Sequence, residues 1–204
     1  AYMRQDRRFK DGEAVTSHDF ARMVSNNFDW LATVDPHLHR IASLADLYTI
    51  PAGTAQAAPA IAEWIRTNVK SPLLFGPDEE SGQWVGAVAQ AADAPHMVLR
   101  KIRHGDRDVE ITVPEIGTLK SRTPVLVDDI VSSGRTVIET VSHLVRAGTA
   151  PPVCIAVHGI FADTALAGIE AAGAGRVVTT NSIPHETNQI DISSLLTDAI
   201  RPLL

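Results

Sequence analysis

The chain has 204 residues, is 45% hydrophobic and carries 18 Lys and Arg against 24 Asp and Glu, a net charge of −6. This length and composition fit a globular protein of one or two domains. The acidic balance argues against nucleic-acid binding, which normally uses a basic surface. No apolar run is long enough to cross a bilayer, so we expect no membrane partner and a cytoplasmic protein. A disulfide within the chain is excluded, because Cys154 is the single cysteine.

The first third of the chain predicts two helices with a short strand between them. Residues 14–28 have a helical apolar pattern, with Thr16 or Ser17 as the N-cap. Residues 30–35, "WLATVD", read as a strand that ends in an acid. Residues 54–69 have apolar side chains at helical spacing and predict the second helix.

From residue 72 onward, predicted strands and helices alternate. The strands are residues 72–76, 96–102, 124–130, 152–161 and 176–181, and the helices are residues 82–92, 135–148 and 162–173. Most of these strands are almost continuously apolar, which predicts an α/β fold with a mostly parallel sheet covered on both faces. Residues 108–113, "DVEITV", alternate with charges, so we expect them beside the sheet rather than in it.

Polar residues follow three of the predicted strands, where ligands of such sheets bind. They are Asp35 with His37, the segment from Asp78 to Ser81, and the segment from Asp128 to Thr136. The agreement of three strand ends favours a binding site at the carboxyl edge of the sheet.

The stretch "VLVDDIVSSGRT", residues 125–136, joins a predicted buried strand to a helix start. The first turn of a helix presents unpaired N–H groups and a partial positive charge, which stabilise a phosphate. The carboxylates of Asp128 and Asp129 would accept hydrogen bonds from sugar hydroxyls. Together they favour a pentose phosphate, whereas the alternative is an ordinary strand, a capping serine and a turn.

With these residues in place, the chain resembles a known family. "VLVDDIVSSGRT" is similar to the phosphoribosyl-pyrophosphate loop of type I phosphoribosyltransferases and ribose-phosphate pyrophosphokinases. "MRQDRRFKDGEAVT" resembles the ATP-binding segment found in the pyrophosphokinases only. "TVDPHLH", "GPDEESGQWV", "LRKIR" and "TTNSIPH" resemble further segments of the pyrophosphokinases, in the same order along the chain.

The resemblance implies two tandem phosphoribosyltransferase-like domains with mostly parallel sheets. We expect residues 1–55 to be the C-terminal part of the first domain and residues 56–204 to be the second domain. Family members carry about half a domain before a segment like "RQDR", so the first domain is expected to be incomplete in this chain. The family also implies a homo-oligomer.

The implied reaction transfers the pyrophosphoryl group of Mg-ATP to the anomeric hydroxyl of ribose 5-phosphate, giving phosphoribosyl pyrophosphate and AMP. The implied cofactor is Mg²⁺, associated with His37 and Asp78, and the implied catalytic pair is Lys101 and Arg103. The implied ATP-binding residues are Arg4, Gln5, Asp6, Arg7 and His37. The implied ribose 5-phosphate-binding residues are Asp128, Asp129, Ser132, Ser133, Gly134, Arg135 and Thr136.

Some positions depart from the family pattern. Arg135 is unusual in the phosphate loop, Pro36 replaces a leucine, and Ile102 replaces an arginine between the two catalytic cations. Two alternatives therefore stay open: a type I phosphoribosyltransferase acting on a base, and a non-catalytic regulatory homologue. The "RQDR" segment argues against the first, and the retained pair of Lys101 and Arg103 argues against the second.

Overall fold

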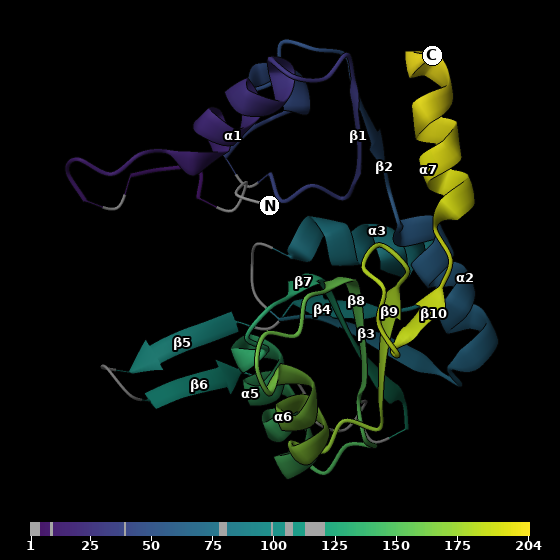
Figure 1. Ribbon diagram of the computed structural model, residues 1–204. Helices are drawn as coiled ribbons and strands as arrows, with labels where there is room; N and C mark the ends of the chain where they lie inside the picture. Colours follow the sequence, from purple (N-terminus) through teal and green to yellow (C-terminus); the bar gives the residue numbers. More distant parts are fainter. Residues whose placement is uncertain are drawn as a thin grey trace. The chain divides into compact units, whose positions relative to one another are not determined.

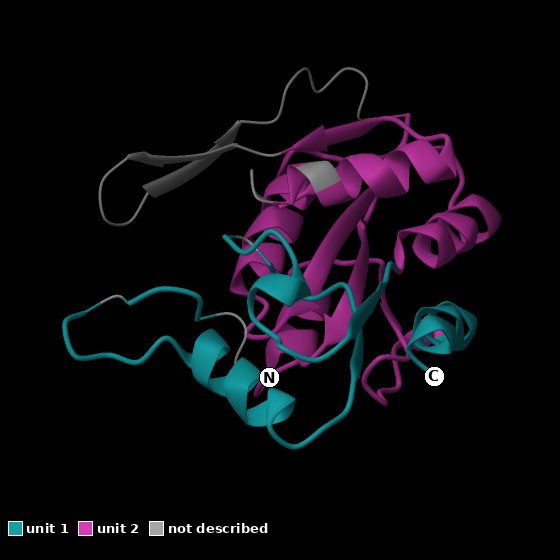
Figure 2. Ribbon diagram, turned by 90° about the horizontal axis from the view of Figure 1, so that it is seen from above, with its two compact units in different colours: residues 1–56, 193–204 teal, residues 57–192 magenta. Residues whose placement is uncertain are grey.

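The computed structural model describes residues 5–8, 10–38, 40–77, 81–98, 100–104, 108–112 and 121–204. The chain forms two compact units, shown in teal and magenta in Figure 2. Unit 1 comprises residues 1–56 and 193–204, and unit 2 comprises residues 57–192. The predicted domain bounds, 1–55 and 56–204, differ from these units at the C-terminal end of the chain.

Unit 1 is built on two parallel strands, β1 and β2, which pair from Leu31 with Ala52 onward. Its elements are α1 (Thr16–Ser25), β1 (Leu31–Val34), η1 (Leu44–Asp46), β2 (Ala52–Ala55), α7 (Ser193–Ile200) and η2 (Arg201–Leu203). A small core fills the space between α1 and the segment that follows η1; its buried members are Ala21, Val24, Leu44 and Tyr48.

Both helices predicted in this region exist, with different starts. Helix α1 begins at Thr16 after Val15, so neither Thr16 nor Ser17 serves as the N-cap. The helix predicted over residues 54–69 begins only at Ala58, because the residues before it pair with β1 as strand β2. Pairing in a sheet here overrides the helical pattern of the sequence.

The last helix, α7, was not predicted, and it packs against β1 and β2. Gly53 makes this packing possible at strand β2. A Cβ atom at Gly53 would lie only 2.6 Å from the backbone oxygen of Ala199 and 3.2 Å from Cδ1 of Leu203. The absence of a side chain at residue 53 therefore lets the strand and the helix approach closely.

Unit 2 contains a six-stranded sheet in the order β10-β9-β8-β7-β3-β4, and every neighbouring pair is parallel. This confirms the α/β fold with a parallel sheet. The strands are β3 (Pro72–Gly76), β4 (His96–Val98), β7 (Thr123–Val131), β8 (Val153–Gly159), β9 (Arg176–Thr180) and β10 (Asn188–Ile190). Strand β10, at the edge, was not predicted from the sequence.

Helices cover both faces of this sheet, as Figure 1 shows. Helices α2 (Ala58–Asn68) and α3 (Gly82–Ala92) lie on one face, and α5 (Arg135–Arg146) and α6 (Ala165–Ala171) lie on the other. The core under α5 and α6 consists of buried side chains from the three central strands and the two helices: Leu73, Phe75, Leu126, Val131, Val137, Val141, Leu144, Cys154, Ala156 and Ile169. Alternate side chains of a strand point to opposite faces, so the sheet is buried on both.

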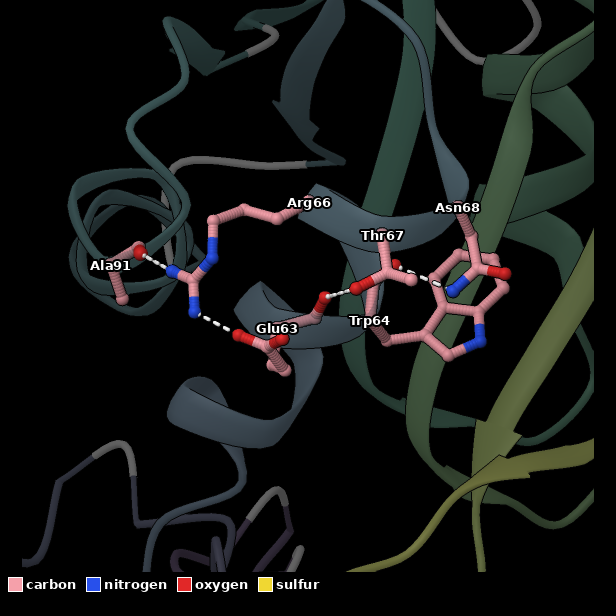
Figure 3. Close-up of polar contacts among 6 residues, drawn as sticks. All are labelled: Glu63, Trp64, Arg66, Thr67, Asn68 and Ala91. Carbon is pink, nitrogen blue, oxygen red and sulfur yellow. Dashed lines mark hydrogen bonds and ion pairs between the residues drawn. The ribbon is translucent and has the colours of Figure 1, made fainter.

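Polar contacts tie α2 to its neighbour α3 (Figure 3). The guanidinium of Arg66 donates hydrogen bonds to the carboxylate of Glu63 and to the carbonyl oxygen of Ala91 in α3. At the end of α2, Asn68 Nδ2 donates to the carbonyl oxygen of Trp64 at 2.9 Å. The bond to Ala91 satisfies a carbonyl group in the last turn of α3, where the helix itself offers no N–H partner.

Strands β5 (Arg100–His104) and β6 (Asp108–Thr112) form an antiparallel pair of their own. The charged stretch 108–113 was expected beside the main sheet, and the pair is indeed separate from the six strands. No helix among the described residues combines the length and the apolar content needed to cross a membrane.

We predict that Gly53→Ala destabilises the protein by about 1–3 kcal/mol, because the added methyl group would overlap a backbone oxygen that cannot rotate away. Gly86→Ala in α3 is the matched control. Its Cβ would lie 3.5 Å from the nearest atom, an ordinary contact, and alanine favours a helix. Thermal unfolding of both variants measures the difference, and equal midpoints would contradict the close packing of α7 on β2.

Candidate functional site

The carboxyl edge of the six-stranded sheet has a topological switch point between β3 and β7. These strands are neighbours, but the chain leaves β3 through α3 towards β4 and leaves β7 through α5 towards β8. The two connections run on opposite faces of the sheet (Figure 1). A crevice forms at such a point, and ligands of open α/β sheets bind there. The predicted phosphate loop follows β7 and therefore lies at the switch point.

The loop after β7 turns directly into helix α5. Gly134 is the N-cap residue and has φ 69° and ψ 2°, a left-handed conformation that favours glycine. Its carbonyl oxygen accepts the first helical hydrogen bond, from the Ile138 N–H at 2.8 Å. The N–H groups of the first turn have no partner within the helix and point towards the loop. This geometry fits an anion such as a phosphate.

Hydroxyl side chains surround this helix start. Ser133 is exposed, and Ser132 and Thr136 are half-buried. Arg135, the unusual residue of the loop, is also exposed. Ser132 and Ser133 therefore precede the N-cap Gly134, and Arg135 and Thr136 lie in the first turn of α5.

The segment after β8 forms hydrogen bonds with the loop that joins β7 to α5. The N–H groups of Ile160 and Phe161 both donate to the carbonyl oxygen of Val131 at 3.0 Å. The Ala162 N–H donates to the carbonyl oxygen of Ser132, also at 3.0 Å. These three bonds fix the backbone of the loop before α5 begins.

Side chains of helix α6 pack against the turn at Gly134. A Cβ atom on that residue would lie 3.3 Å from the Cβ of Ala165 and 3.4 Å from Cδ1 of Ile169. Glycine is thus favoured at this position for two reasons, the left-handed backbone and the close approach of α6.

Two residues of the segment after β8 have left-handed backbones without being glycine. Phe161 has φ 44° and Asp163 has φ 53°. Such conformations cost free energy and occur where the surrounding structure imposes them. The ring of Phe161 packs against the ring of His185 with centroids 4.8 Å apart, which holds it in place. Sequence reasoning missed this segment, because nothing in "GIFADT" signals a strained turn.

The two predicted sugar-binding acids lie half-buried near the end of β7. Each accepts a hydrogen bond from the next backbone N–H: Asp129 N–H donates to Oδ1 of Asp128 at 3.0 Å, and Ile130 N–H donates to Oδ1 of Asp129 at 2.7 Å. These bonds orient each carboxylate against its own backbone, three to four residues before the phosphate loop in the chain. Carboxylates in this position can accept hydrogen bonds from a sugar or bind a hydrated Mg²⁺.

A histidine that the sequence analysis did not select lies at the end of the next strand. His158 on β8 is opposite Ile130 on β7, and its Nδ1 lies 2.9 Å from Oγ of Ser182. Since Ser182 Oγ donates to the carbonyl oxygen of Val157, it accepts the bond from His158, which places the proton on Nδ1. His158 is thus an oriented polar group on the same edge of the sheet.

The predicted ATP-binding residues that the structure describes belong to unit 1. Gln5 Nε2 donates to the carbonyl oxygen of Ala14 at 3.0 Å, and the carboxylate of Asp6 forms an ion pair with Arg40. Arg7 is exposed, and His37 is half-buried in the segment after β1. The side chain of Gln5 therefore makes a contact near its own segment, whereas that of Asp6 contacts the segment after β1.

The remaining predicted residues are described in part or not at all. Arg4 and Asp78 lie outside the described residues. Lys101 and Arg103 are both in strand β5, two positions apart, opposite Ile111 and Val109 of β6, and the structure describes their backbone only.

Two further groups bear on the chemistry. In the described part of the chain, no three His, Cys, Asp or Glu side chains gather as a metal site. An oxygen-ligated Mg²⁺ that keeps several waters and binds substrate phosphates needs no such cluster.

Burial raises the pKa of the Cys154 thiol to about 12, so this cysteine is a core residue and not a nucleophile.

We predict that Gly134→Ala weakens binding of inorganic phosphate by about tenfold or more, because the substitution distorts the helix start that would hold the anion. Gly148→Ala is the matched control at the other end of α5. Gly148 has φ 76°, so alanine introduces similar backbone strain, but no atom lies within 4 Å of the added Cβ. Calorimetric titration with phosphate separates the two, and equal losses of affinity would contradict an anion site at Gly134.

The chain is similar to known proteins in sequence and in fold. The family model described as the phosphoribosyl transferase domain matches residues 43–190. The ribose-phosphate pyrophosphokinase of Methanopyrus kandleri is 30% identical over 205 residues, which cover all of this chain and 69% of that protein. The crystal structure of a phosphoribosylpyrophosphate synthetase from Mycobacterium smegmatis has a similar fold, with a TM-score of 0.81 and 22% identity over 99% of this chain and 68% of that one. The chain therefore belongs to the ribose-phosphate pyrophosphokinase family and has the phosphoribosyltransferase fold.

Proposed function

We propose that the protein transfers the pyrophosphoryl group of ATP to the anomeric hydroxyl of ribose 5-phosphate, giving phosphoribosyl pyrophosphate and AMP. The observation that carries this proposal is that the sequence similarity extends over the whole chain. It covers the whole chain at 30% identity to a ribose-phosphate pyrophosphokinase, including the "RQDR" segment that lies outside the matched transferase domain. A transferase acting on a base has no need of such a segment.

The loop after β7 is the proposed site for the sugar phosphate. The 5-phosphate binds to the N–H groups of the first turn of α5 and to the hydroxyls of Ser132, Ser133 and Thr136. Asp128 and Asp129 accept hydrogen bonds from the ribose hydroxyls. The backbone from Val131 to Gly134 is held by hydrogen bonds and close packing, which supports this assignment. A loop that is already ordered loses little conformational entropy when it binds an anion.

The segment of unit 1 that contains Arg4, Gln5, Asp6 and Arg7 is the proposed ATP site, together with His37. Guanidinium groups suit phosphates, because their planar donors match the spacing of phosphate oxygens. The hydrogen bond from Gln5 to Ala14 and the ion pair from Arg40 to Asp6 support this role, because they fix the backbone that carries Arg7.

In the proposed reaction the anomeric oxygen of ribose 5-phosphate attacks the β-phosphorus of ATP. A new O–P bond forms, the bond from the β-phosphorus to the oxygen shared with the α-phosphate breaks, and AMP leaves with that oxygen. The hydroxyl proton is released to water in this step, which balances the charges of the two products. Lys101 and Arg103 stabilise the negative charge that spreads over the phosphates in the transition state.

Mg²⁺ is part of the proposal, since it neutralises phosphate charge in this class of reaction. The carboxylates of Asp128 and Asp129 fit its preference for oxygen ligands and bound water. We propose that Asp78 and His37 contribute to the metal-bound nucleotide, with His37 contacting ATP or metal-bound water. Assembly into a homo-oligomer is also part of the proposal.

The direct test incubates the full-length protein with ATP, Mg²⁺ and ribose 5-phosphate and measures the products by chromatography. AMP and phosphoribosyl pyrophosphate in equal amounts are expected. Release of pyrophosphate from phosphoribosyl pyrophosphate and a base would favour a transferase instead. Binding of nucleotide without any product would favour a non-catalytic homologue.

We predict that Lys101→Ala lowers kcat by about a hundredfold or more, while ribose 5-phosphate still binds, because a cation that acts mainly in the transition state contributes little to substrate affinity. Steady-state kinetics with a separate titration of ribose 5-phosphate measure both quantities. A kcat close to that of the wild type would remove Lys101 from the mechanism.

Asp128→Asn combined with Asp129→Asn is expected to weaken ribose 5-phosphate binding by about tenfold, because amides are poorer acceptors than carboxylates for hydroxyl donors. Calorimetry gives the affinity, and thermal unfolding serves as the control. Unchanged affinity with a lower unfolding temperature would show that the two acids only stabilise the end of β7.

A further inference from the structure

Arg40 forms an ion pair that joins two distant segments of unit 1. Its Nη1 lies 2.9 Å from Oδ1 and 3.2 Å from Oδ2 of Asp6, across 34 residues of sequence. The first segment contains Gln5, Asp6 and Arg7, and the second follows β1 and contains His37. The ion pair therefore connects the two parts of the proposed ATP site that lie in this unit.

The two partners differ in their exposure to water. The side chain of Asp6 is only 6% exposed, whereas that of Arg40 is 50% exposed. A carboxylate withdrawn from water needs a compensating charge or hydrogen bonds. Removal of Arg40 would take away the cation that faces Asp6 and would favour a rearrangement that returns the carboxylate to water.

Other ion pairs among the described residues join neighbouring residues of one helix or helical turn, unlike the pair of Asp6 with Arg40. Arg22 with Asp19 and Arg201 with Asp198 each join residues three positions apart, with both partners well exposed. Such local pairs contribute little, because water screens them. Only a pair between distant segments can set the position of one segment against another, and the pair of Asp6 with Arg40 does so.

Gln5, the residue before Asp6, forms hydrogen bonds with the start of α1 and the residues before it. The carbonyl oxygen of Gln5 accepts a hydrogen bond from the Ser17 N–H at 3.2 Å, at the start of α1. Gln5 Nε2 also donates to the carbonyl oxygen of Ala14. The ion pair with Arg40 thus adds an anchor towards the segment of His37, which the anchors at Gln5 do not reach.

We propose that Arg40 is a positioning residue for the nucleotide: through Asp6, it holds the Gln5–Arg7 segment and the segment of His37 in the arrangement that binds the phosphates of ATP. The inference rests on the proposed function for the identity of the nucleotide. Arg40 acts on Asp6 and not on the ligand.

The test uses the full-length protein and α,β-methylene-ATP. In this analogue a carbon atom replaces the oxygen between the α- and β-phosphates, so the bond that the reaction would break cannot be cleaved. Calorimetry measures the Kd of this analogue and, separately, the Kd of ribose 5-phosphate. For Arg40→Met we expect the Kd of the analogue to rise about tenfold, with the Kd of ribose 5-phosphate unchanged within about twofold. Arg40→Lys keeps the charge and should restore most of the affinity.

A double-mutant cycle separates positioning from direct contact. If Arg40 acts through Asp6, the variant Asp6→Asn with Arg40→Met binds the analogue no more weakly than the weaker of the two single variants. Additive losses would overturn the proposal, because they would mean that Arg40 touches the nucleotide itself. Arg22→Gln is the matched control, since it removes an exposed arginine of the same unit and should change neither Kd.

Thermal unfolding separates positioning from a general loss of structure. Equal weakening of both ligands together with a lower unfolding temperature would overturn the proposal. If Arg40→Met does not fold, Arg40→Gln takes its place, and failure of both to fold would equally overturn it. A wild type that binds the analogue but forms no AMP would refute the proposed function alone, whereas a wild type that binds no nucleotide would overturn both.

Discussion

The structure of the candidate site depends on one backbone constraint, the left-handed turn at Gly134. This turn directs the chain from the end of β7 into the first turn of α5, and the close approach of Ala165 and Ile169 leaves little room for a side chain there. Three hydrogen bonds from the segment after β8 hold the preceding backbone in register. An anion site formed largely by backbone N–H groups is accurate only if that backbone is rigid, which explains why the support comes from two neighbouring elements.

Much of unit 2 and of the phosphate loop could be predicted from the sequence, because the information there is local. The apolar strand of residues 124–130, the amphipathic helix of residues 135–148 and the small residues between them each carry their own pattern. Strand β7 and helix α5 were found within two residues of their bounds for that reason. The parallel sheet followed from the alternation of strands and helices.

Features that depend on contacts between distant residues could not be predicted in the same way. Strand β10 is three residues long and is defined by its pairing with β9, so no period of its own marks it. The start of α2 was placed too early, because Thr54 and Ala55 pair with β1. The ion pair of Arg40 with Asp6 and the strained turn at Phe161 also appear only when the chain is folded.

Helix α7 has a consequence for the order in which the chain can fold during synthesis. Its residues follow unit 2 in the chain, yet it packs against β1 and β2, which precede unit 2. Unit 2 is continuous in sequence, so all of its strands leave the ribosome before α7 does. Domains generally fold as units as they emerge. We therefore expect unit 2 to fold before unit 1 is complete, while the surface of β1 and β2 that α7 covers stays open to water until α7 has been made.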